Sequence, residues 1–121
     1  MSRILLHEPV ENHGECRSLL EGVASDVVAC ADHESLVSAL GRARPDVLVY
    51  VIHSLRQDLR LLESLRGVAP LLPIILLGGP ADLRARRAFQ VLKPTYYGLL
   101  PVEGSELSDV VRGALRRISR H

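Results

Sequence analysis

Aromatic side chains are almost absent from this chain, which has no tryptophan, one phenylalanine and three tyrosines among 121 residues. A hydrophobic core must therefore consist mainly of leucine, valine, isoleucine and alanine. No apolar run approaches the roughly 20 residues that a membrane-spanning helix needs. The first apolar segment is short and ends in the polar pair His7-Glu8, which does not suit a secretory signal. We therefore expect a cytoplasmic protein without a membrane segment.

Cysteine is also scarce, since the chain has only Cys16 and Cys30, and their spacing fits neither a metal site nor a redox motif. We interpret both as small apolar core residues of a reducing compartment. Apolar residues make up 47% and charged residues 24%, which is the balance of an ordinary globular protein. A length of 121 residues suits one hydrophobic core, so we expect a single domain over residues 1–121.

The net charge is only +1, but the charges are unevenly distributed. Residues 1–66 contain ten acidic residues and seven arginines, whereas residues 67–121 contain four acidic and eight basic residues. The second half is therefore locally basic. This pattern fits solvated helix faces, and it also fits a surface for an acidic partner.

Short apolar runs alternate with longer amphipathic stretches along the whole chain. We expect strands at residues 4–6, 27–31, 47–52, 74–77 and 96–100. We expect helices at residues 11–23, 33–43, 55–66 and 81–92, and from residue 102 onward. Asp32 suits the N-cap of the second helix, Gly67 the C-terminal end of the third, and Ser105 the cap of the last.

Five strand–helix pairs with short connections predict a parallel sheet covered by helices on both faces, which is a three-layer α/β fold. In such a sheet the functional crevice lies beyond the carboxyl ends of the strands, where the strand order reverses. This rule directs attention to His7, Glu8, His53, Gly78 and Leu100.

Four segments resemble one family, the receiver domains of two-component response regulators. Residues 45–53 are similar to the third receiver strand, in which Pro-Asp precedes four apolar residues and an aspartate. Residues 73–79 resemble the fourth strand, residues 97–102 the fifth, and residues 4–8 a first strand that usually ends in two acids. The resemblance covers essentially the whole chain. It implies a flavodoxin-like (βα)5 fold with a five-stranded parallel sheet in the order 2-1-3-4-5.

Receiver chemistry transfers a phosphoryl group onto an aspartate, with help from a metal held by acids, a lysine and a hydroxyl. Matched to the family pattern, the aspartate position holds Val51, the hydroxyl position Gly78 and the lysine position Leu100. The pair of acids is reduced to Glu8 followed by Pro9, which is a poor magnesium site. The resemblance therefore implies a degenerate phosphorylation site.

Two family features are retained in this region, namely Tyr97 and Pro101, and the resemblance implies a cis peptide bond before Pro101. A buried carboxylate and its cationic partners are expected to disappear together, because either one alone would be an unpaired buried charge. We expect Val51 and Leu100 to pack against each other where the ion cluster would be. No catalytic residue remains, so we expect no enzyme activity and no cofactor.

The sequence thus favours a pseudo-receiver that works as a phosphorylation-independent protein interaction module in signal transduction or transcription regulation. Receivers bind partners and form homodimers through the fourth helix, the fifth strand and the fifth helix. Residues of this chain that fall on that face are Arg84, Arg86, Arg87, Tyr97, Arg112 and Arg116.

Three alternatives use other features. His7, Glu8 and His53 follow neighbouring strands, and two imidazoles with a carboxylate can bind zinc or iron. The same crevice, made more apolar by Val51 and Leu100, could instead hold a small molecule and act as a sensor. Direct binding of nucleic acid by the basic half is less favoured, because there is no base-reading motif and little aromatic surface for stacking.

Overall fold

The computed structural model describes residues 2–79 and 83–119, and it describes side chains at residues 2–79 and 85–117. Five strands form one sheet in the order β2-β1-β3-β4-β5, and all four pairings are parallel. The strands are β1 (Arg3–His7), β2 (Asp26–Cys30), β3 (Val47–Val51), β4 (Ile74–Gly78) and β5 (Tyr96–Leu99). The expected fold class and strand order are both confirmed.

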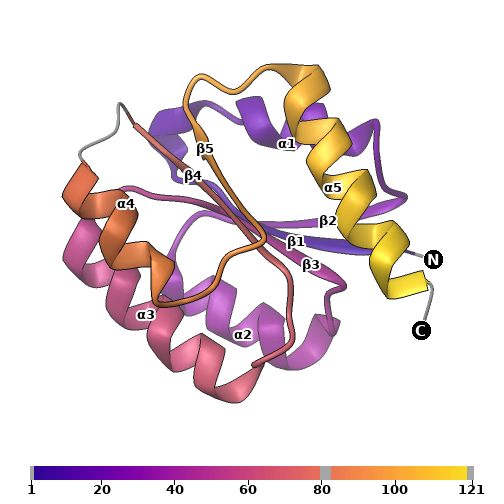
Figure 1. Ribbon diagram of the computed structural model, residues 1–121. Coiled ribbons are helices and arrows are strands. Elements are labelled where there is room, and N and C mark those ends of the chain that lie inside the picture. The colour runs from indigo at the N-terminus through magenta and orange to yellow at the C-terminus, as the bar shows by residue number, and fades with distance from the viewer. Residues whose placement is uncertain (1, 80–82, 120–121) are drawn as a thin grey trace.

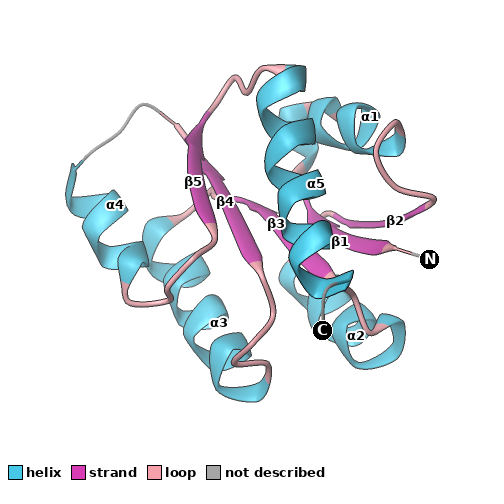
Figure 2. Cartoon of the chain, turned by 45° about the vertical axis from the view of Figure 1, so that its right-hand side comes forward, coloured by secondary structure: helices cyan, strands magenta, loops and turns pink. Residues whose placement is uncertain are grey.

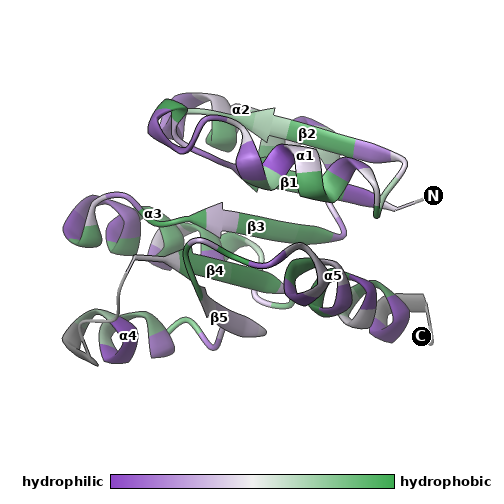
Figure 3. Cartoon of the chain, turned by 90° about the horizontal axis from the view of Figure 1, so that it is seen from above, coloured by the Kyte–Doolittle hydropathy of each residue, from purple (hydrophilic) through white to green (hydrophobic). Residues whose placement is uncertain are grey.

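Helices cover the two faces of the sheet (Figure 1). They are α1 (Glu15–Glu21), α2 (His33–Ala43), α3 (Leu55–Val68), α4 (Leu83–Gln90) and α5 (Gly104–Ser119), and a short 3₁₀ helix, η1 (Val10–Asn12), precedes α1. Seen from above, α1 and α5 lie on one face, and α2, α3 and α4 lie on the other (Figure 3). None of the helices in the described part of the chain is both long and apolar enough to cross a bilayer.

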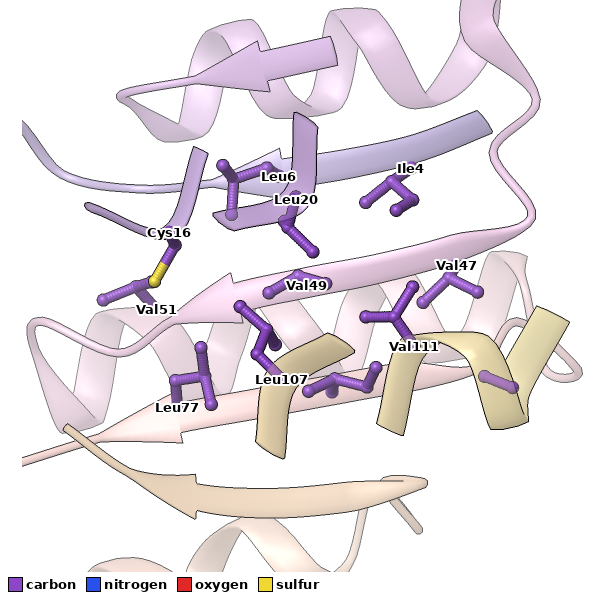
Figure 4. Close-up of a cluster of buried hydrophobic side chains, with 12 residues drawn as sticks. Ile4, Leu6, Cys16, Leu20, Val47, Val49, Val51, Leu77, Leu107 and Val111 are labelled. Carbon is purple, nitrogen blue, oxygen red and sulfur yellow. The ribbon is translucent and has the colours of Figure 1, made fainter. Parts of the chain in front are cut away.

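Each face of the sheet contributes to a separate aliphatic cluster. On the α1/α5 face, Cys16 and Leu20 pack with Leu107, Val111 and the inward side chains of the central strands (Figure 4). On the other face, Leu36, Leu62, Leu65 and Phe89 cover the opposite side chains of the same strands. Every residue of β3 and β4 is buried, whereas the outer strands β2 and β5 are mostly half-buried. This difference is the expected signature of a parallel sheet buried on both faces.

The helix expected at residues 11–23 is the largest correction to the sequence analysis. The structure has η1 first, and α1 begins only at Glu15. His13 and Gly14 both have left-handed backbone conformations, with φ of 55° and 72°. Two such residues in succession interrupt a right-handed helix, so one long helix becomes two short ones.

The ends of the other helices and strands differ from the expected ends by smaller amounts. The second strand is displaced by one residue from the expected 27–31. Gly67 does not end α3, which continues to Val68, and Ser105 lies inside α5, which begins at Gly104. By contrast, α2 has the expected bounds, because the Asp32 carboxylate accepts a hydrogen bond from the Ser35 amide at 2.7 Å and caps the helix. The expected helix at 81–92 is shorter within the described residues, where α4 ends at Gln90 and Lys93 has a φ of 50°.

Candidate functional site

The carboxyl edge of the sheet is where the predicted site residues meet. β1 pairs with β2 on one side and with β3 on the other, so the strand order reverses at β1. The pairing of His7 with Tyr50 brings the ends of β1 and β3 together. Side chains of adjacent strand residues point to opposite faces, so Tyr50 and Val51 enter different clusters. The edge therefore has two regions, one on each face of β3.

The first region surrounds Val51 on the α1/α5 face. Val51 is 3% exposed and belongs to the aliphatic cluster, against which Leu100 also packs. Figure 4 shows the sulfur of Cys16 directed toward Val51. Burial raises the pKa of the Cys16 thiol to about 12, and the nearby Glu8 carboxylate contributes to the rise, so the thiol stays protonated at neutral pH. This side of the edge is an apolar core.

Gly78 and Tyr97 lie next to each other at the end of β4. Gly78 is buried, and a Cβ atom at this position would lie 2.8 Å from the Tyr97 hydroxyl oxygen and 3.4 Å from Cζ. The tyrosine therefore occupies the space that a side chain at position 78 would need. Tyr97 is half-buried beside Phe89, with ring centroids 6.5 Å apart. A larger residue at position 78 would therefore need Tyr97 to shift.

The loop after β5 contains a cis peptide bond, and residue 100 is a leucine rather than a cationic residue. The Leu100–Pro101 peptide bond is cis, as the resemblance implies. The Leu100 amide donates a hydrogen bond to the Gly78 carbonyl at 2.7 Å, which extends the pairing of β4 and β5 by one residue. Leu100 is half-buried and Pro101 is exposed. No ionic group lies at this position.

Glu8 follows β1, and its carboxylate accepts hydrogen bonds from the first turn of α1. Its carboxylate accepts hydrogen bonds from the Cys16 amide at 2.8 Å, from the Arg17 amide at 3.2 Å and from the Asn12 side chain. The N-cap residue, Gly14, has no side chain, so Glu8 supplies the acceptor that the first turn of α1 lacks. Its oxygens are therefore committed to α1. Pro9 follows as the N-cap of η1.

His7, Glu8 and His53 do not assemble into a metal site. Glu8 is directed to α1, His7 is buried against Tyr50, and the His53 side chain is exposed. Among the described residues, no group of three or more histidine, cysteine or acidic side chains has a geometry that could hold a metal ion.

The second region of the edge contains a buried acid that the sequence analysis missed. Asp58 of α3 is 1% exposed. One carboxylate oxygen accepts hydrogen bonds from the Tyr50 hydroxyl at 2.6 Å and from Nε2 of His33 at 2.9 Å. The other accepts from the backbone amides of His53 at 2.7 Å and Ser54 at 2.8 Å. Because four donors surround it, this carboxylate is a structural centre and a poor nucleophile.

The donors also fix the ionisation of this cluster. Burial alone would raise the pKa of Asp58. The hydrogen bonds from Tyr50, from the His53 and Ser54 amides and from His33 lower it by more than burial raises it, so the pKa lies below the usual value. Burial also raises the pKa of Tyr50, and the hydrogen bond to Asp58 adds to this rise. Asp58 is therefore ionised and Tyr50 neutral at pH 7.

His7 completes the cluster at the end of β1. Its ring stacks on the Tyr50 ring, with centroids 4.2 Å apart and planes 11° apart, and lies 5.5 Å from the His33 ring. Burial lowers the pKa of His7, so the imidazole is neutral at pH 7. Nδ1 of His7 is buried and has no hydrogen-bond partner. The imidazole is also part of the wall of a cavity of about 280 Å³, which His33, His53 and Asp58 line as well.

A signal for this cluster was present in the sequence. Asp58 falls on the apolar stripe of α3, three residues after Leu55 and four before Leu62, where helical periodicity calls for an apolar side chain. Tyr50 is likewise the one polar residue of β3. An acid and a phenol at buried positions are expected to be partners, because each needs a hydrogen bond.

The predicted partner face lies around β5, which Figure 2 shows at the edge of the sheet with α4 on one side and α5 on the other. Arg86 and Arg87 of α4 and Arg112 and Arg116 of α5 are exposed. The Arg86 guanidinium carbon lies 5.7 Å from the centre of the Tyr97 ring, which is a cation–π contact. The side chain of Arg84 lies outside the described residues. Of the four arginines whose side chains are described, Arg86 is therefore the one with a contact to Tyr97, and the others are exposed on the two helices that flank β5.

Comparisons with known proteins agree with this architecture. No family model and no curated protein matches the sequence. Solved structures do match. A response regulator receiver domain protein from Clostridium thermocellum has a TM-score of 0.82 and 20% identity, over 98% of each chain.

Two further structures extend the likeness. A CheY-like receiver domain protein from Methanospirillum hungatei has a TM-score of 0.85 and 17% identity, over 99% of this chain and 98% of that one. The signal receiver domain of an HD domain-containing protein from Pseudomonas fluorescens has a TM-score of 0.85 and 20% identity, with the same coverage. The chain therefore has the fold of response-regulator receiver domains.

Proposed function

We propose that this chain is an atypical receiver domain that acts without phosphorylation, as a protein interaction module in signal transduction or transcription regulation. The observation that carries the proposal is the packing of Tyr97 into the space beside Gly78. A hydroxyl side chain that could bind a phosphoryl group at position 78 would have to displace this tyrosine. We also propose that the domain works in signalling in the cytoplasm.

The ionisable groups of the edge support the same proposal. Phosphoryl transfer to a receiver needs a free carboxylate and a metal. Val51 and Leu100 belong to an apolar cluster, and the two buried acids nearby, Glu8 and Asp58, are each held by at least three donors. An acid with its lone pairs engaged cannot both attack phosphorus and remain a structural acceptor. We therefore propose that the domain is not an enzyme.

The face around β5 is the proposed contact surface. Tyr97 lies beside Gly78, and the Arg86 guanidinium lies over its ring, so this face combines an aromatic side chain with a cation. Exposed arginines on α4 and α5 give it a positive character that suits an acidic partner. We propose a protein partner or a second copy of the chain at this face, and no direct contact with nucleic acid.

The central test is an NMR titration of the isotope-labelled chain with beryllofluoride and magnesium, which mimic an aspartyl phosphate. We expect no saturable change at Val51, Gly78 or Leu100. A saturable response confined to these residues would overturn the proposal.

Charge reversal tests the contact surface. Arg86→Glu with Arg87→Glu is compared with a matched control on α3, Arg56→Glu with Arg60→Glu, whose arginines are also exposed. Sedimentation velocity, or binding of a partner, should change only for the α4 pair. Equal behaviour of both pairs would exclude α4 from the contact surface.

A second candidate function is a small-molecule sensor, and one observation favours it. His7 lines the cavity near Asp58, its buried Nδ1 has no hydrogen-bond partner, and a buried unpaired polar atom costs about 1–3 kcal/mol. A ligand with a hydrogen-bond donor would satisfy it. A fragment screen by NMR, repeated with His7→Phe, checks this idea. If no fragment shifts the His7, His33 and His53 resonances of the unsubstituted protein, the cavity has no such role.

A further inference from the structure

A continuous apolar surface lies at the opposite end of the sheet, on the side of α2 and α3. A hollow of about 280 Å³ between α2 and α3 is lined by Val37, Leu40, Leu61, Leu65 and Val68 among others. Leu40 and Val68 also line a second hollow of about 490 Å³, which continues along the loop before β4. We call these two hollows, together with a third that continues along the same loop, the α2–α3 groove.

The groove extends further along the same loop. Residues 70–73 line the second hollow and also a third of about 460 Å³, which reaches the end of α4 at Val91 and Leu92. Val68 is 80% exposed, Leu71 92% and Val91 68%. These side chains, together with Val37, are four of the seven large hydrophobic residues that are exposed in the described part of the chain. Adjacent exposed apolar side chains of this kind mark interaction sites.

Arg66 holds this surface in place. Its Nε donates to the Leu92 carbonyl at 2.9 Å, and its Nη1 donates to the Leu72 carbonyl at 2.6 Å and to the Ala69 and Pro70 carbonyls at 3.2 Å. One guanidinium therefore ties the loop before β4 to the segment after α4. Leu71 is exposed on a loop that these hydrogen bonds hold in place. An apolar surface that is already ordered loses little conformational entropy when it binds.

The charges around the groove have one prevailing sign. Its lining contains Arg44, Arg66 and Lys93 but only one acid, Asp46. The Asp46 carboxylate already accepts a hydrogen bond from the Arg3 amide at 2.8 Å. Arg44 and Lys93 are exposed at the rim. Electrostatic complementarity therefore requires acidic groups on whatever covers the groove.

We propose that the α2–α3 groove docks an amphipathic helix of a partner protein, whose apolar stripe is flanked by acidic residues. A hollow between two helices is the shape that receives a third helix, with anchors at helical spacing. The groove is separate from the β5 face and from the phosphorylation edge. The inference therefore goes beyond the proposed function and does not depend on it.

The test uses two synthetic helical peptides that share one leucine stripe and differ only in their flanking residues, glutamate in one and lysine in the other. Binding is measured by isothermal titration calorimetry and mapped by NMR. We expect the glutamate peptide to bind at least about tenfold more tightly, which corresponds to about 1.4 kcal/mol. Its resonance changes should centre on Leu40, Val68 and Leu71.

Two variants with substitutions at exposed positions are compared, one in the groove and one outside it. Val68→Asp with Leu71→Asp should weaken binding of the glutamate peptide at least about tenfold. Val10→Asp is the control, because Val10 is 76% exposed but lies at the other end of the molecule, before α1. It should leave binding unchanged. Circular dichroism checks that both variants keep the fold.

Three results would overturn the inference: no binding of the glutamate peptide, equal binding of both peptides, or equal binding by the Val68→Asp/Leu71→Asp variant. Sedimentation supplies a fourth. A dimer of the unsubstituted chain that dissociates in this variant would mean that a second copy covers the groove. The beryllofluoride titration reports on the opposite edge, so its failure and failure of the groove are separate results.

Discussion

Tyr50 and Val51 are neighbours in β3, and their surroundings are opposite in character. Val51 faces α1 and α5 and is enclosed by aliphatic side chains. Tyr50 faces α2 and α3 and donates to a buried carboxylate that three other donors also hold. Val51 and the aliphatic side chains around it carry no charge, whereas the region around Tyr50 contains a carboxylate that is 1% exposed.

The difference shows what allows a buried charge to persist. A buried carboxylate is tolerated when hydrogen-bond donors replace its water, and it is costly when they are absent. Asp58 has four donors, and two of them are backbone amides, which a change of side chain other than to proline leaves in place. A carboxylate at position 51 would have Leu100 where receivers have a lysine. The two regions therefore predict opposite responses to the gain or loss of an acid.

Removing the acid from the polar region should have the largest effect. Asp58→Ala leaves the His53 and Ser54 amides without an acceptor and leaves the Tyr50 hydroxyl with only Nε2 of His33, at 3.0 Å. We expect the free energy of unfolding to fall by about 3–5 kcal/mol, measured by urea denaturation followed by circular dichroism.

Two control variants show whether that loss of stability comes from the buried acid. Asp58→Asn keeps an acceptor oxygen and should cost less. Asp26→Ala removes an exposed ion pair with Arg3, which is worth about 0–1 kcal/mol. If Asp58→Ala cost no more than Asp26→Ala, the polar region would contribute nothing to stability, and the contrast with Val51 would fail.

Adding an acid to the apolar region should have the next largest effect. Val51→Asp places a carboxylate among aliphatic side chains, and we expect a loss of about 2–4 kcal/mol at pH 7. Burial raises the pKa of such a group above its unfolded value. The penalty should therefore shrink as the pH falls toward about 5 and the carboxyl takes up a proton.

A second substitution sharpens this result. Leu100→Lys supplies the cation that the family pattern has, so the double variant Val51→Asp/Leu100→Lys should recover part of the loss. A double-mutant cycle measures the coupling. Zero coupling would show that residue 100 does not reach position 51, contrary to their packing in one cluster.

Filling the space beside Gly78 should have a smaller effect. Gly78→Ala brings a methyl group to within 2.8 Å of the Tyr97 hydroxyl, so the tyrosine must move. We expect a loss of about 1–2 kcal/mol. Tyr97→Phe removes that oxygen, so Gly78→Ala should cost much less in a Tyr97→Phe background. The same cost in both backgrounds would mean that Tyr97 does not fill this space.

The apolar region could be predicted from the sequence, and the polar region could not. Val51, Gly78 and Leu100 lie at positions that the strand pattern and the family resemblance both define, so their meeting follows from the topology. Asp58, His33 and Tyr50 come from three separate elements. Their contact depends on side-chain directions around the switch point, which periodicity does not give. The sequence signals for it were the acid on the apolar stripe of α3 and the one polar residue of β3, Tyr50.

Helix ends show the same distinction between local and distant causes. α2 has its predicted bounds because Asp32 caps it with a neighbour in sequence. α1 is capped by Glu8, seven residues before its first residue, and its start was predicted wrongly. A local cap can be read from the sequence, whereas a cap supplied across a loop depends on the fold.

The smallest predicted effect is the pH dependence that His7 gives to the polar region. Burial lowers the pKa of His7 in the folded chain below its ordinary value of 6.5, although Asp58 partly opposes this shift. The unfolded chain then binds a proton more readily than the folded chain. The contribution of His7 to stability is therefore complete above about pH 6.5 and declines as the pH falls below it.

His7→Phe removes this titration and retains a ring that can stack on Tyr50. Urea denaturation between about pH 5 and pH 8 should show a flatter dependence of the unfolding free energy on pH in the variant. The other four histidines remain in the variant. Because Val51 and its neighbours do not titrate in this range, the change belongs to the polar region alone. An unchanged slope would mean that His7 takes up its proton equally well in the folded chain, and the polar region would then be open to water.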